Sequence, residues 1–215
     1  MDDKTLEYSD SELRAADSAI IGKAEFVLSV AQLNQLPADS LPEIAFAGRS
    51  NVGKSSIINA ITSQSGLART SNTPGRTQQL NFFKLADKLF LVDFPGYGFA
   101  KAPEAQVKQW QKMIFAYLQD RASLKRVFLL IDARHGLKKV DTEIMELLDK
   151  AAVTYQIILT KIDKISSTEL AKVVSATNDE IKKHAAAYAK IIATSSEKKI
   201  GISELRAEIH SLMQN

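Results

Sequence analysis

Hydrophobic and polar positions follow two alternating patterns from about residue 43 onward. Short apolar runs, typical of buried strands, are separated by longer stretches whose apolar residues recur with helical spacing. The strand-like runs are Glu43–Ala47, Leu80–Leu85, Lys88–Asp93, Arg126–Ile131, Tyr155–Thr160 and Lys190–Ala193. The helical stretches are Lys54–Thr62, Pro103–Arg121, Lys139–Ala152, Thr168–Tyr188 and Ile202–Met213. This alternation predicts an α/β domain with a mostly parallel sheet.

Two further features complete this outline. Only Ala86 and Asp87 separate the second and third strand-like runs, so these strands should form an antiparallel hairpin. The first residues, up to about Ala19, are polar and without a clear pattern. We therefore expect residues 1–23 to form a loose, flexible extension in front of one domain spanning 24–215. Within that domain, Ala24–Val30 is predicted to be an edge strand or a short lead-in element.

The composition is that of an ordinary globular protein, with 45% hydrophobic and 25% charged residues in a chain of 215. The absence of cysteine excludes disulfides, thiolate zinc sites and cysteine nucleophiles. The acidic N-terminus does not resemble a signal or transit peptide, and no apolar run is long enough to cross a bilayer. We therefore expect a cytoplasmic protein without a membrane partner. A net charge of +3 and a pI near 8.9 favour a nucleic-acid partner only weakly.

The segment Gly48-Arg49-Ser50-Asn51-Val52-Gly53-Lys54-Ser55 matches the phosphate-binding loop pattern G-x-x-x-x-G-K-[ST]. A strand-like run precedes it and a helical stretch follows, which is the context that the motif needs. Successive backbone N–H groups and the helix N-terminus would surround the phosphates of a nucleotide. Lys54 would reach the β- and γ-phosphates, and the Ser55 hydroxyl would bind Mg²⁺ directly.

A second motif, Asp93-Phe94-Pro95-Gly96, ends the strand-like run Lys88–Asp93. An acidic residue at this point would hold Mg²⁺ through a water molecule. The Gly96 N–H would contact the γ-phosphate and respond to its loss. By itself the motif is also compatible with a plain strand end and a Pro-Gly turn, so its interpretation depends on the phosphate-binding loop.

A third motif, Thr160-Lys161-Ile162-Asp163, follows the strand-like run of residues 155–160. The Asp163 carboxylate can accept hydrogen bonds from N1–H and the 2-amino group of guanine, and adenine lacks this donor pair. A site built in this way discriminates strongly between bases. Lys161 would lie against the base plane. After the last strand, Thr194-Ser195-Ser196 would close over the guanine with backbone N–H groups, although such residues commonly just begin a turn.

The loop between the first two motifs, Ser71–Gln79, contains two threonines that would suit a nucleotide-dependent switch. Both Thr73 and Thr77 have the hydroxyl needed to bind Mg²⁺ when a γ-phosphate is present. Thr77 is the better candidate because it lies nearer the strand that must fix its position. The residues of this loop predicted to contact the nucleotide are Gly75, Arg76, Thr77, Gln78 and Gln79.

The ordered motifs resemble those of a Ras-like G domain, from about Glu43 to the C-terminus. This resemblance implies a three-layer α/β fold with six strands, five parallel and one antiparallel, in the order 2-3-1-4-5-6. It also implies a Mg²⁺-dependent GTPase in which Lys54, Thr77 and Gly96 serve hydrolysis. A prenylated signalling switch is disfavoured because no C-terminal cysteine exists. An ATP-using enzyme is disfavoured by Asp163.

Several segments narrow the resemblance to the EngB (YihA/YsxC) family of bacterial GTPases, which is linked to assembly of the large (50S) ribosomal subunit. They are residues 47–55, 68–78 and 92–98, together with Asp132-Ala133-Arg134-His135. The family implies Thr77 as the switch ligand of Mg²⁺, in agreement with its position. It also implies that the partners are GTP or GDP and a 50S particle with its rRNA and proteins. We expect a monomer, and a Ras-like switch acting on an unrelated protein is the alternative.

Two positions bear on the rate of hydrolysis. Tyr97 stands where Ras-type proteins have a water-orienting glutamine, and a phenol cannot orient water as an amide does. Slow intrinsic hydrolysis is therefore expected. Related GTPases bind K⁺ at the position of Asn51, so K⁺ is a second candidate cofactor, although Asn51 would equally serve to shape the loop. Basic residues near the expected switches would suit rRNA phosphates; they are Arg69, Arg76, Lys101, Lys108, Lys112, Arg134, His135, Lys138 and Lys139.

Overall fold

A computed structural model describes residues 8–68, 79–98 and 104–214, and the side chains of 104–110 are not described. The strands are β1 (Ala24–Val30), β2 (Glu43–Gly48), β3 (Leu80–Leu85), β4 (Leu89–Asp93), β5 (Leu124–Asp132), β6 (Tyr155–Thr160) and β7 (Ile192–Ala193). The helices are α1 (Asp10–Ile20), α2 (Lys54–Thr62), α3 (Glu104–Asp120), α4 (Lys139–Lys150), α5 (Ser167–Ile181) and α6 (Ile202–Met213).

These strands form one sheet in the order β1-β3-β4-β2-β5-β6-β7. β3 pairs antiparallel with both β1 and β4, whereas β2 pairs in parallel with β4 and β5. The six predicted strands and their order are confirmed. Ala24–Val30 adds a seventh strand at the edge, where the sequence left an edge strand and a lead-in element as alternatives. The fold class is that of the Ras-like α/β GTPases.

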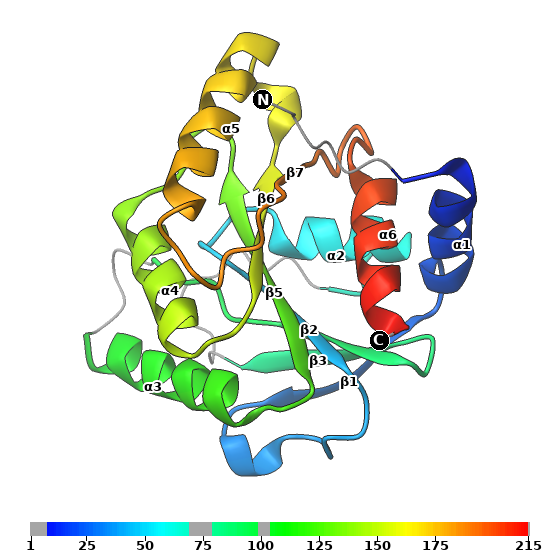
Figure 1. The fold of residues 1–215 in the computed structure, drawn as a ribbon. Helices are drawn as coiled ribbons and strands as arrows, with labels where there is room; N and C mark the ends of the chain where they lie inside the picture. The colour runs from blue at the N-terminus through cyan, green and yellow to red at the C-terminus, as the bar shows by residue number, and fades with distance from the viewer. Residues whose placement is uncertain (1–7, 69–78, 99–103, 215) are drawn as a thin grey trace.

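Helices cover both faces of this sheet, which gives three layers (Figure 1). One core lies between the sheet and α3, α4 and α5, and it contains Tyr117, Met145 and Ile181. The other lies between the sheet and α1, α2 and α6, with Ile20 and Leu205 among its members. Because both faces are covered, every residue of β2 is buried, as expected for a central parallel strand.

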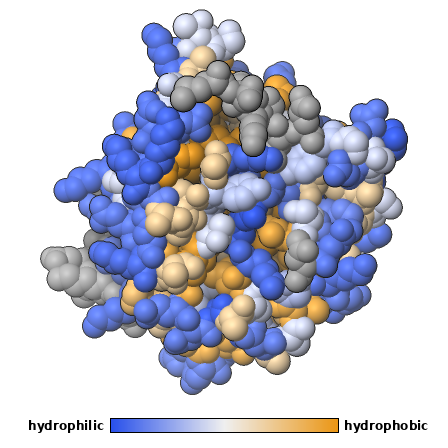
Figure 2. Space-filling model, viewed as in Figure 1, coloured by the Kyte–Doolittle hydropathy of each residue, from blue (hydrophilic) through white to orange (hydrophobic). Residues whose placement is uncertain are grey.

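The described helices present mainly polar side chains to solvent. Figure 2 shows one face of the molecule, on which hydrophilic residues surround smaller areas of hydrophobic residues. Within the described parts of the chain, no helix combines the length and the apolar character that a bilayer span requires.

The N-terminal segment differs from expectation, because residues 10–20 form helix α1 rather than a loose extension. Ser9 caps this helix reciprocally with Glu12: the Glu12 N–H donates to Ser9 Oγ, and the Ser9 N–H donates to the Glu12 carboxylate. Ile20 is fully buried, and Arg206 of α6 donates to Asp17 at 2.8 Å. The prediction failed because the stability of this helix comes from docking on α6.

Helix α5 is shorter than predicted, ending at Ile181 instead of Tyr188. The residues that follow are diverted toward α4 by Asp149, whose carboxylate accepts from the Ala186 N–H at 2.9 Å. His184 Nδ1 lies 2.6 Å from the same carboxylate. Tertiary contacts therefore override the helix propensity of the alanine-rich segment 185–187.

Candidate nucleotide-binding site

The phosphate-binding loop connects β2 to α2 at the carboxyl edge of the sheet. Two residues adopt left-handed backbone conformations, Asn51 at φ 61° and Gly53 at φ 107°, and the second lies immediately before α2. Gly48 is packed closely, since a Cβ atom there would lie 2.8 Å from Val52 Cγ1 and 3.1 Å from Leu130 Cβ. The loop is thus tightly wound, with the N-terminus of a nine-residue helix at its end, an arrangement suited to anions.

Lys54 and Asp93 meet where β2 and β4 end side by side. Phe46 pairs with Asp93 in the sheet, and Lys54 Nζ lies 2.8 Å from Asp93 Oδ1. Both side chains are largely buried, at 12% and 11% exposure. The half-buried Ser55 follows Lys54 at the start of α2. A cation and two kinds of oxygen donor therefore lie together at this edge.

The oxygen atoms of Asp93 and Ser55 suit Mg²⁺ better than a metal ion whose ligands all come from the protein. The described residues contain no group of three or more His, Cys, Asp or Glu that could hold an ion. Mg²⁺ in phosphate-processing sites takes one or two protein oxygens and completes its coordination with phosphate and water. Asp93 and Ser55 fit that requirement.

The segment after β4 is hydrogen-bonded to the start of the phosphate-binding loop. The Ser50 N–H donates to the Tyr97 carbonyl at 3.0 Å, and the Tyr97 N–H donates to the Gly48 carbonyl at 3.3 Å. Gly96 lies against the loop, because a Cβ atom there would approach Ser50 Cα to 3.0 Å. Gly96 is therefore adjacent to the loop that is predicted to hold the phosphates.

Three residues predicted near the nucleotide direct their side chains elsewhere. Phe94 is buried against Tyr117, with ring centroids 5.4 Å apart. The Arg49 side chain contacts Asp141, with Nε 3.3 Å from Oδ2, and donates to the Gly136 carbonyl at 3.2 Å. Val52 is buried as well. Only the backbone of these residues is left to face a ligand, and Pro95 beside them is half-buried.

The loop after β6 is bonded to the phosphate-binding loop through side chains. Thr160 Oγ1 donates to the Val52 carbonyl at 2.7 Å. Lys161, with a left-handed φ of 59°, donates from Nζ to the Asn51 carbonyl at 2.6 Å. The structure thus brings together two motifs that are about 110 residues apart in sequence.

Asp163 follows in a short 3₁₀ turn, Ile162–Lys164, with its side chain only 7% exposed. Ser195 Oγ donates to Asp163 Oδ1 at 2.6 Å, and Lys164 Nζ lies 3.1 Å from Oδ2. The hydrogen bond from Ser195 holds the pKa of the Asp163 carboxyl below its usual range. Each carboxylate oxygen keeps a further lone pair, so an ionised acceptor is available to a base.

The segment Thr194–Ser196 is fixed beside this carboxylate. The Thr194 N–H and hydroxyl both donate to the Leu159 carbonyl, and the Thr194 carbonyl accepts from the Ile162 N–H. Ser195 is buried and its hydroxyl also accepts from the Lys198 N–H at 3.0 Å. Ser196 is half-buried. The predicted segment therefore reaches Asp163 through the Ser195 side chain. The prediction that its backbone N–H groups face guanine does not hold for Thr194 and Ser195, because the Ser195 N–H donates to the Ile200 carbonyl at 2.9 Å and the Thr194 N–H to Leu159.

Sequence reasoning assigned no role to Asp132, which nevertheless contacts this end of the site. Its carboxylate lies 3.0 Å from Lys161 Nζ and accepts from Arg134 Nε at 3.0 Å and Nη2 at 2.7 Å. Burial alone would raise the pKa of the Asp132 carboxyl, but the hydrogen bonds from Arg134 and Lys161 lower it to about 2. Its position in the sequence could have indicated a role, because Asp132 ends strand β5 in the same way that Asp93 ends strand β4.

A cavity of about 780 Å³ opens beside these residues. Its lining includes Gly53 of the phosphate-binding loop together with Thr160, Lys161, Asp163 and Ser196. Residues of two predicted motifs therefore line one cavity, and binding of a base there stays a prediction.

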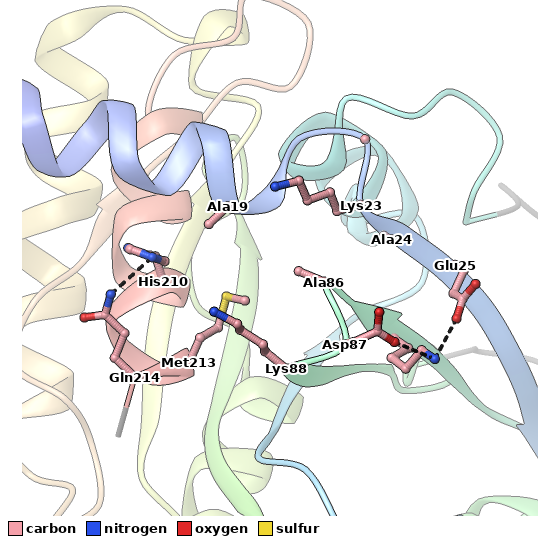
Figure 3. Close-up of a pocket in the computed structure, with 12 residues that line it drawn as sticks. Ala19, Lys23, Ala24, Glu25, Ala86, Asp87, Lys88, His210, Met213 and Gln214 are labelled. Carbon is pink, nitrogen blue, oxygen red and sulfur yellow. Dashed lines mark hydrogen bonds and ion pairs between the residues drawn. The ribbon is translucent and has the colours of Figure 1, made fainter.

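A second cavity, of about 530 Å³, lies between the α1–β1 turn, the β3–β4 hairpin and the end of α6 (Figure 3). It is lined by none of the predicted motif residues. One of its lysines, Lys84, is already paired with Glu25 and Asp87 at 2.9 and 2.8 Å. This cavity is therefore a poorer nucleotide site than the first.

The expected switch loop lies mostly outside the described residues. This applies to Thr73, Gly75, Arg76, Thr77 and Gln78, and their predicted roles remain predictions. Gln79 is described, as a half-buried residue directly before β3. Among the basic residues, Arg69 and Lys101 also fall outside, and the side chain of Lys108 is not described.

Comparison with known proteins decides the family. A family model described as "50S ribosome-binding GTPase" matches residues 43–161. A "Probable GTP-binding protein EngB" from Chelativorans sp. is 58% identical over 193 residues, covering 86% of each chain. The chain belongs to the EngB family of GTP-binding proteins. The EngB protein of Gluconobacter oxydans is similar at 57% identity over 208 residues, covering 96% of this chain and 92% of its own.

Other comparisons agree with the GTP-binding domain and with its fold. A model of the elongation factor Tu GTP-binding domain matches residues 119–215. The crystal structure of a probable EngB shares the fold with a TM-score of 0.63 at 23% identity, covering 80% of this chain and 98% of its own. The crystal structure of Aquifex aeolicus Era bound to GDP·AlF₄⁻ shares the fold with a TM-score of 0.61 at 18% identity. The match covers 81% of this chain and 56% of the Era chain. As a member of the EngB family, this protein binds guanine nucleotides and hydrolyses GTP.

Proposed function

We propose that this GTPase is a slow, Mg²⁺-dependent molecular switch in assembly of the large ribosomal subunit, acting as a cytoplasmic monomer. The observation that carries the ribosomal part is an exposed basic segment beside the nucleotide site. Arg134, His135, Lys138 and Lys139 all lie on the surface between β5 and α4. The family model that matches the chain is itself described as 50S ribosome-binding.

In hydrolysis, water would attack the γ-phosphorus in line and break its bond to the β–γ bridging oxygen, leaving GDP and phosphate. The Lys54 ammonium and the amides of the phosphate-binding loop would stabilise the charge that develops on the phosphate oxygens. Ser55 and Asp93, with Thr77 from the switch loop, would hold Mg²⁺, which adds electrostatic stabilisation when bound. Gly96 would contact the γ-phosphate through its N–H.

Guanine would be selected at the other end of the cavity. The Asp163 side chain is largely shielded from solvent, and its ionised carboxylate would accept the two hydrogen bonds that only guanine offers. Lys161 would lie along the base, since its ammonium is fixed between the Asn51 carbonyl and Asp132. The segment Thr194–Ser196 would lie beside the base on the side of β7, with Ser196 lining the cavity.

Slow intrinsic hydrolysis is supported by two side chains. The Tyr97 hydroxyl donates to Asp141 at 2.8 Å in the protein interior, so this residue presents no group to an attacking water. The Arg49 guanidinium is engaged by Asp141 and Gly136, so it does not serve as an arginine finger. A partner or a cation would then complete the catalytic site.

K⁺ is the proposed cation, with Asn51 as its protein ligand. The Asn51 residue is exposed, with left-handed backbone, in the phosphate-binding loop. Turnover should be faster in KCl than in NaCl of equal concentration, and the difference should disappear in Asn51→Ala. Asn34→Ala, an exposed asparagine in the turn before β2, serves as the control. Equal turnover of the wild type in both salts would exclude the K⁺ role.

Sedimentation with 50S particles tests the ribosomal proposal. We expect the protein to co-sediment in the presence of a non-hydrolysable GTP analogue and to be released in GDP. Lys138→Glu/Lys139→Glu should abolish co-sedimentation, because it reverses two charges that would face RNA phosphates. The matched control is Lys182→Glu/Lys183→Glu, just past the end of α5, which runs away from the nucleotide edge. Failure to bind in either nucleotide would favour a switch acting on another protein.

A further inference from the structure

Asp141 of α4 is a buried carboxylate that none of the nucleotide motifs includes. Its side chain has no exposed surface, yet it contacts three separate segments. Oδ1 accepts from the Tyr97 hydroxyl at 2.8 Å. Oδ2 accepts from the Lys138 N–H at 2.8 Å and lies 3.3 Å from Arg49 Nε. One carboxylate thus joins α4, the phosphate-binding loop and the segment that follows Gly96.

Capping of α4 accounts for only part of this arrangement. A carboxylate at the third helical position that accepts from the N-cap N–H, as Asp141 does from Lys138, is an ordinary helix cap. That function uses Oδ2 alone. It requires neither the bond from Tyr97 to Oδ1 nor the approach of Arg49. Burial raises the pKa of the Asp141 carboxyl, so its location is costly for a residue that only caps a helix.

The two groups beyond the cap are already joined through their backbones. Arg49 and Tyr97 form a parallel bridge, and the hydrogen bonds of Tyr97 reach Gly48 and Ser50 on either side of Arg49. Asp141, on helix α4, then contacts the side chains of both Arg49 and Tyr97. Movement of Tyr97 relative to the phosphate-binding loop would break the backbone bridge and the side-chain contacts together. Gly96 directly precedes Tyr97 and packs closely against Ser50, so it would move as well.

We propose that Asp141 is a positioning residue for GTP hydrolysis, because it fixes Tyr97 and Arg49 so that Gly96 stays against the start of the phosphate-binding loop. Gly96 and Ser50 lie at the end of the site to which the proposed function assigns the γ-phosphate, and the inference rests on that assignment. The contacts of Asp141 described above are all at this end, whereas Asp132, Lys161 and Asp163 hold the guanine end. Loss of the Asp141 carboxylate should therefore slow hydrolysis without a matching loss of GDP affinity.

Two substitutions test this inference with little change in volume. Asp141→Asn removes the charge beside Arg49, and Tyr97→Phe removes only the phenolic hydroxyl. Single-turnover hydrolysis at saturating GTP should fall about tenfold in each, as expected for misplacement of a reacting group. The GDP dissociation constant should stay within about twofold of wild type. The double variant should be little slower than either single one, because both break the same contact.

Glu146→Gln, an exposed carboxylate on the same helix, is the matched control and should behave as wild type in every measurement. A purely structural role would lower the melting temperature of Asp141→Asn and Tyr97→Phe while leaving the single-turnover rate unchanged, and that result would overturn the proposal. An equal loss of GDP affinity and rate would also overturn it. If Asp141→Asn does not fold, Tyr97→Phe alone decides, because its ring can still fill the core.

Discussion

The two ends of the proposed nucleotide site are built in different ways: a guanine end, where Asp163 would bind the base, and a phosphate end, where Lys54 would bind the phosphates. At the guanine end, side chains bond to one another and to the backbone: Ser195 to Asp163, and Lys161 to both Asp132 and the Asn51 carbonyl. At the phosphate end, the contacts are mainly backbone hydrogen bonds and close glycine packing, together with the ion pair of Lys54 and Asp93. The guanine end is therefore suited to fixed recognition, and the phosphate end to groups that respond to the nucleotide.

This difference predicts two kinds of variant. Substitutions at the guanine end should change which nucleotide binds and how tightly. Substitutions at the phosphate end should change what happens to a nucleotide after it has bound. A guanine-end variant that changed the hydrolysis rate, or a phosphate-end variant that changed nucleotide affinity, would show that the two ends are coupled more closely than their contacts indicate.

The largest effect is expected from Lys54→Ala at the phosphate end. The ammonium would no longer stabilise the charge of the reacting phosphate, and hydrolysis should fall about 10³-fold. Single-turnover phosphate release measures this, with exposed Lys172→Ala on α5 as the control. A decrease in the hydrolysis rate of less than about tenfold would contradict the role given to Lys54. The variant also removes the partner 2.8 Å from Asp93, so its melting temperature should be lower.

The next effect is expected from Asp163→Asn at the guanine end. An amide cannot accept both hydrogen bonds from guanine but can donate to the 2-oxygen of xanthine. GTP affinity should fall about 10²-fold, and XTP should become the preferred nucleotide. Competition between labelled GTP and unlabelled XTP measures the change, with exposed Asp179→Asn as the control. Unchanged preference for GTP would remove Asp163 from the site.

Most of the fold and the motif positions could be predicted because they depend on local pattern. The strand that ends at Asp93 and the loop that begins at Gly48 are defined by apolar runs and by residue types with special chemistry. Helix α1 also has a local signal, since Ser9 and Glu12 have the spacing of a capping box. Its apolar positions were too few to suggest a docked helix, and the contact of Asp17 with Arg206 spans 189 residues.

The buried carboxylates could not be assigned for the same reason. Asp141 looks like any acidic residue in the first turn of a helix, and only the fold brings Tyr97 and Arg49 to it. Asp132 belongs to a family-specific segment, but its pairing with Lys161 depends on strand order. Local pattern therefore finds the residues that are predicted to touch the nucleotide, whereas the residues that hold those in place become visible only in three dimensions.

A smaller effect is expected from Gly96→Ala at the phosphate end. The added methyl group would lie 3.0 Å from Ser50 Cα and 3.2 Å from its nitrogen, so the two segments must separate. Hydrolysis should fall about tenfold, while GDP affinity changes little. Gly22→Ala is a useful control: it strains a backbone at φ 71° in open space and should lower stability without slowing hydrolysis. A similar rate for both variants would contradict the role of Gly96.

The smallest effect is expected from Asp132→Asn, which tests the support behind the guanine end. The variant weakens the hold on Lys161, so GDP affinity should fall about fivefold, with the single-turnover rate at saturating GTP unchanged. Arg134→Ala should have less effect, because it leaves Lys161 paired with Asp132. A loss of rate at saturating GTP in Asp132→Asn would show that this carboxylate serves the phosphate end as well.

The same variant has a pH-dependent signature in stability. The pKa of Asp132 is about 2 in the folded protein and about 4 in an unfolded chain, so its charge stabilises the fold above about pH 4. That contribution is lost as the pH falls from about 4 toward about 2. The free energy of unfolding of wild type should exceed that of Asp132→Asn by about 1 to 2 kcal/mol at about pH 7, and urea titrations should show the gap narrowing at about pH 3. A gap independent of pH would mean that packing, rather than the ionised carboxylate, holds Lys161 in place, and the guanine end would then resemble the phosphate end more closely than its ion pairs suggest.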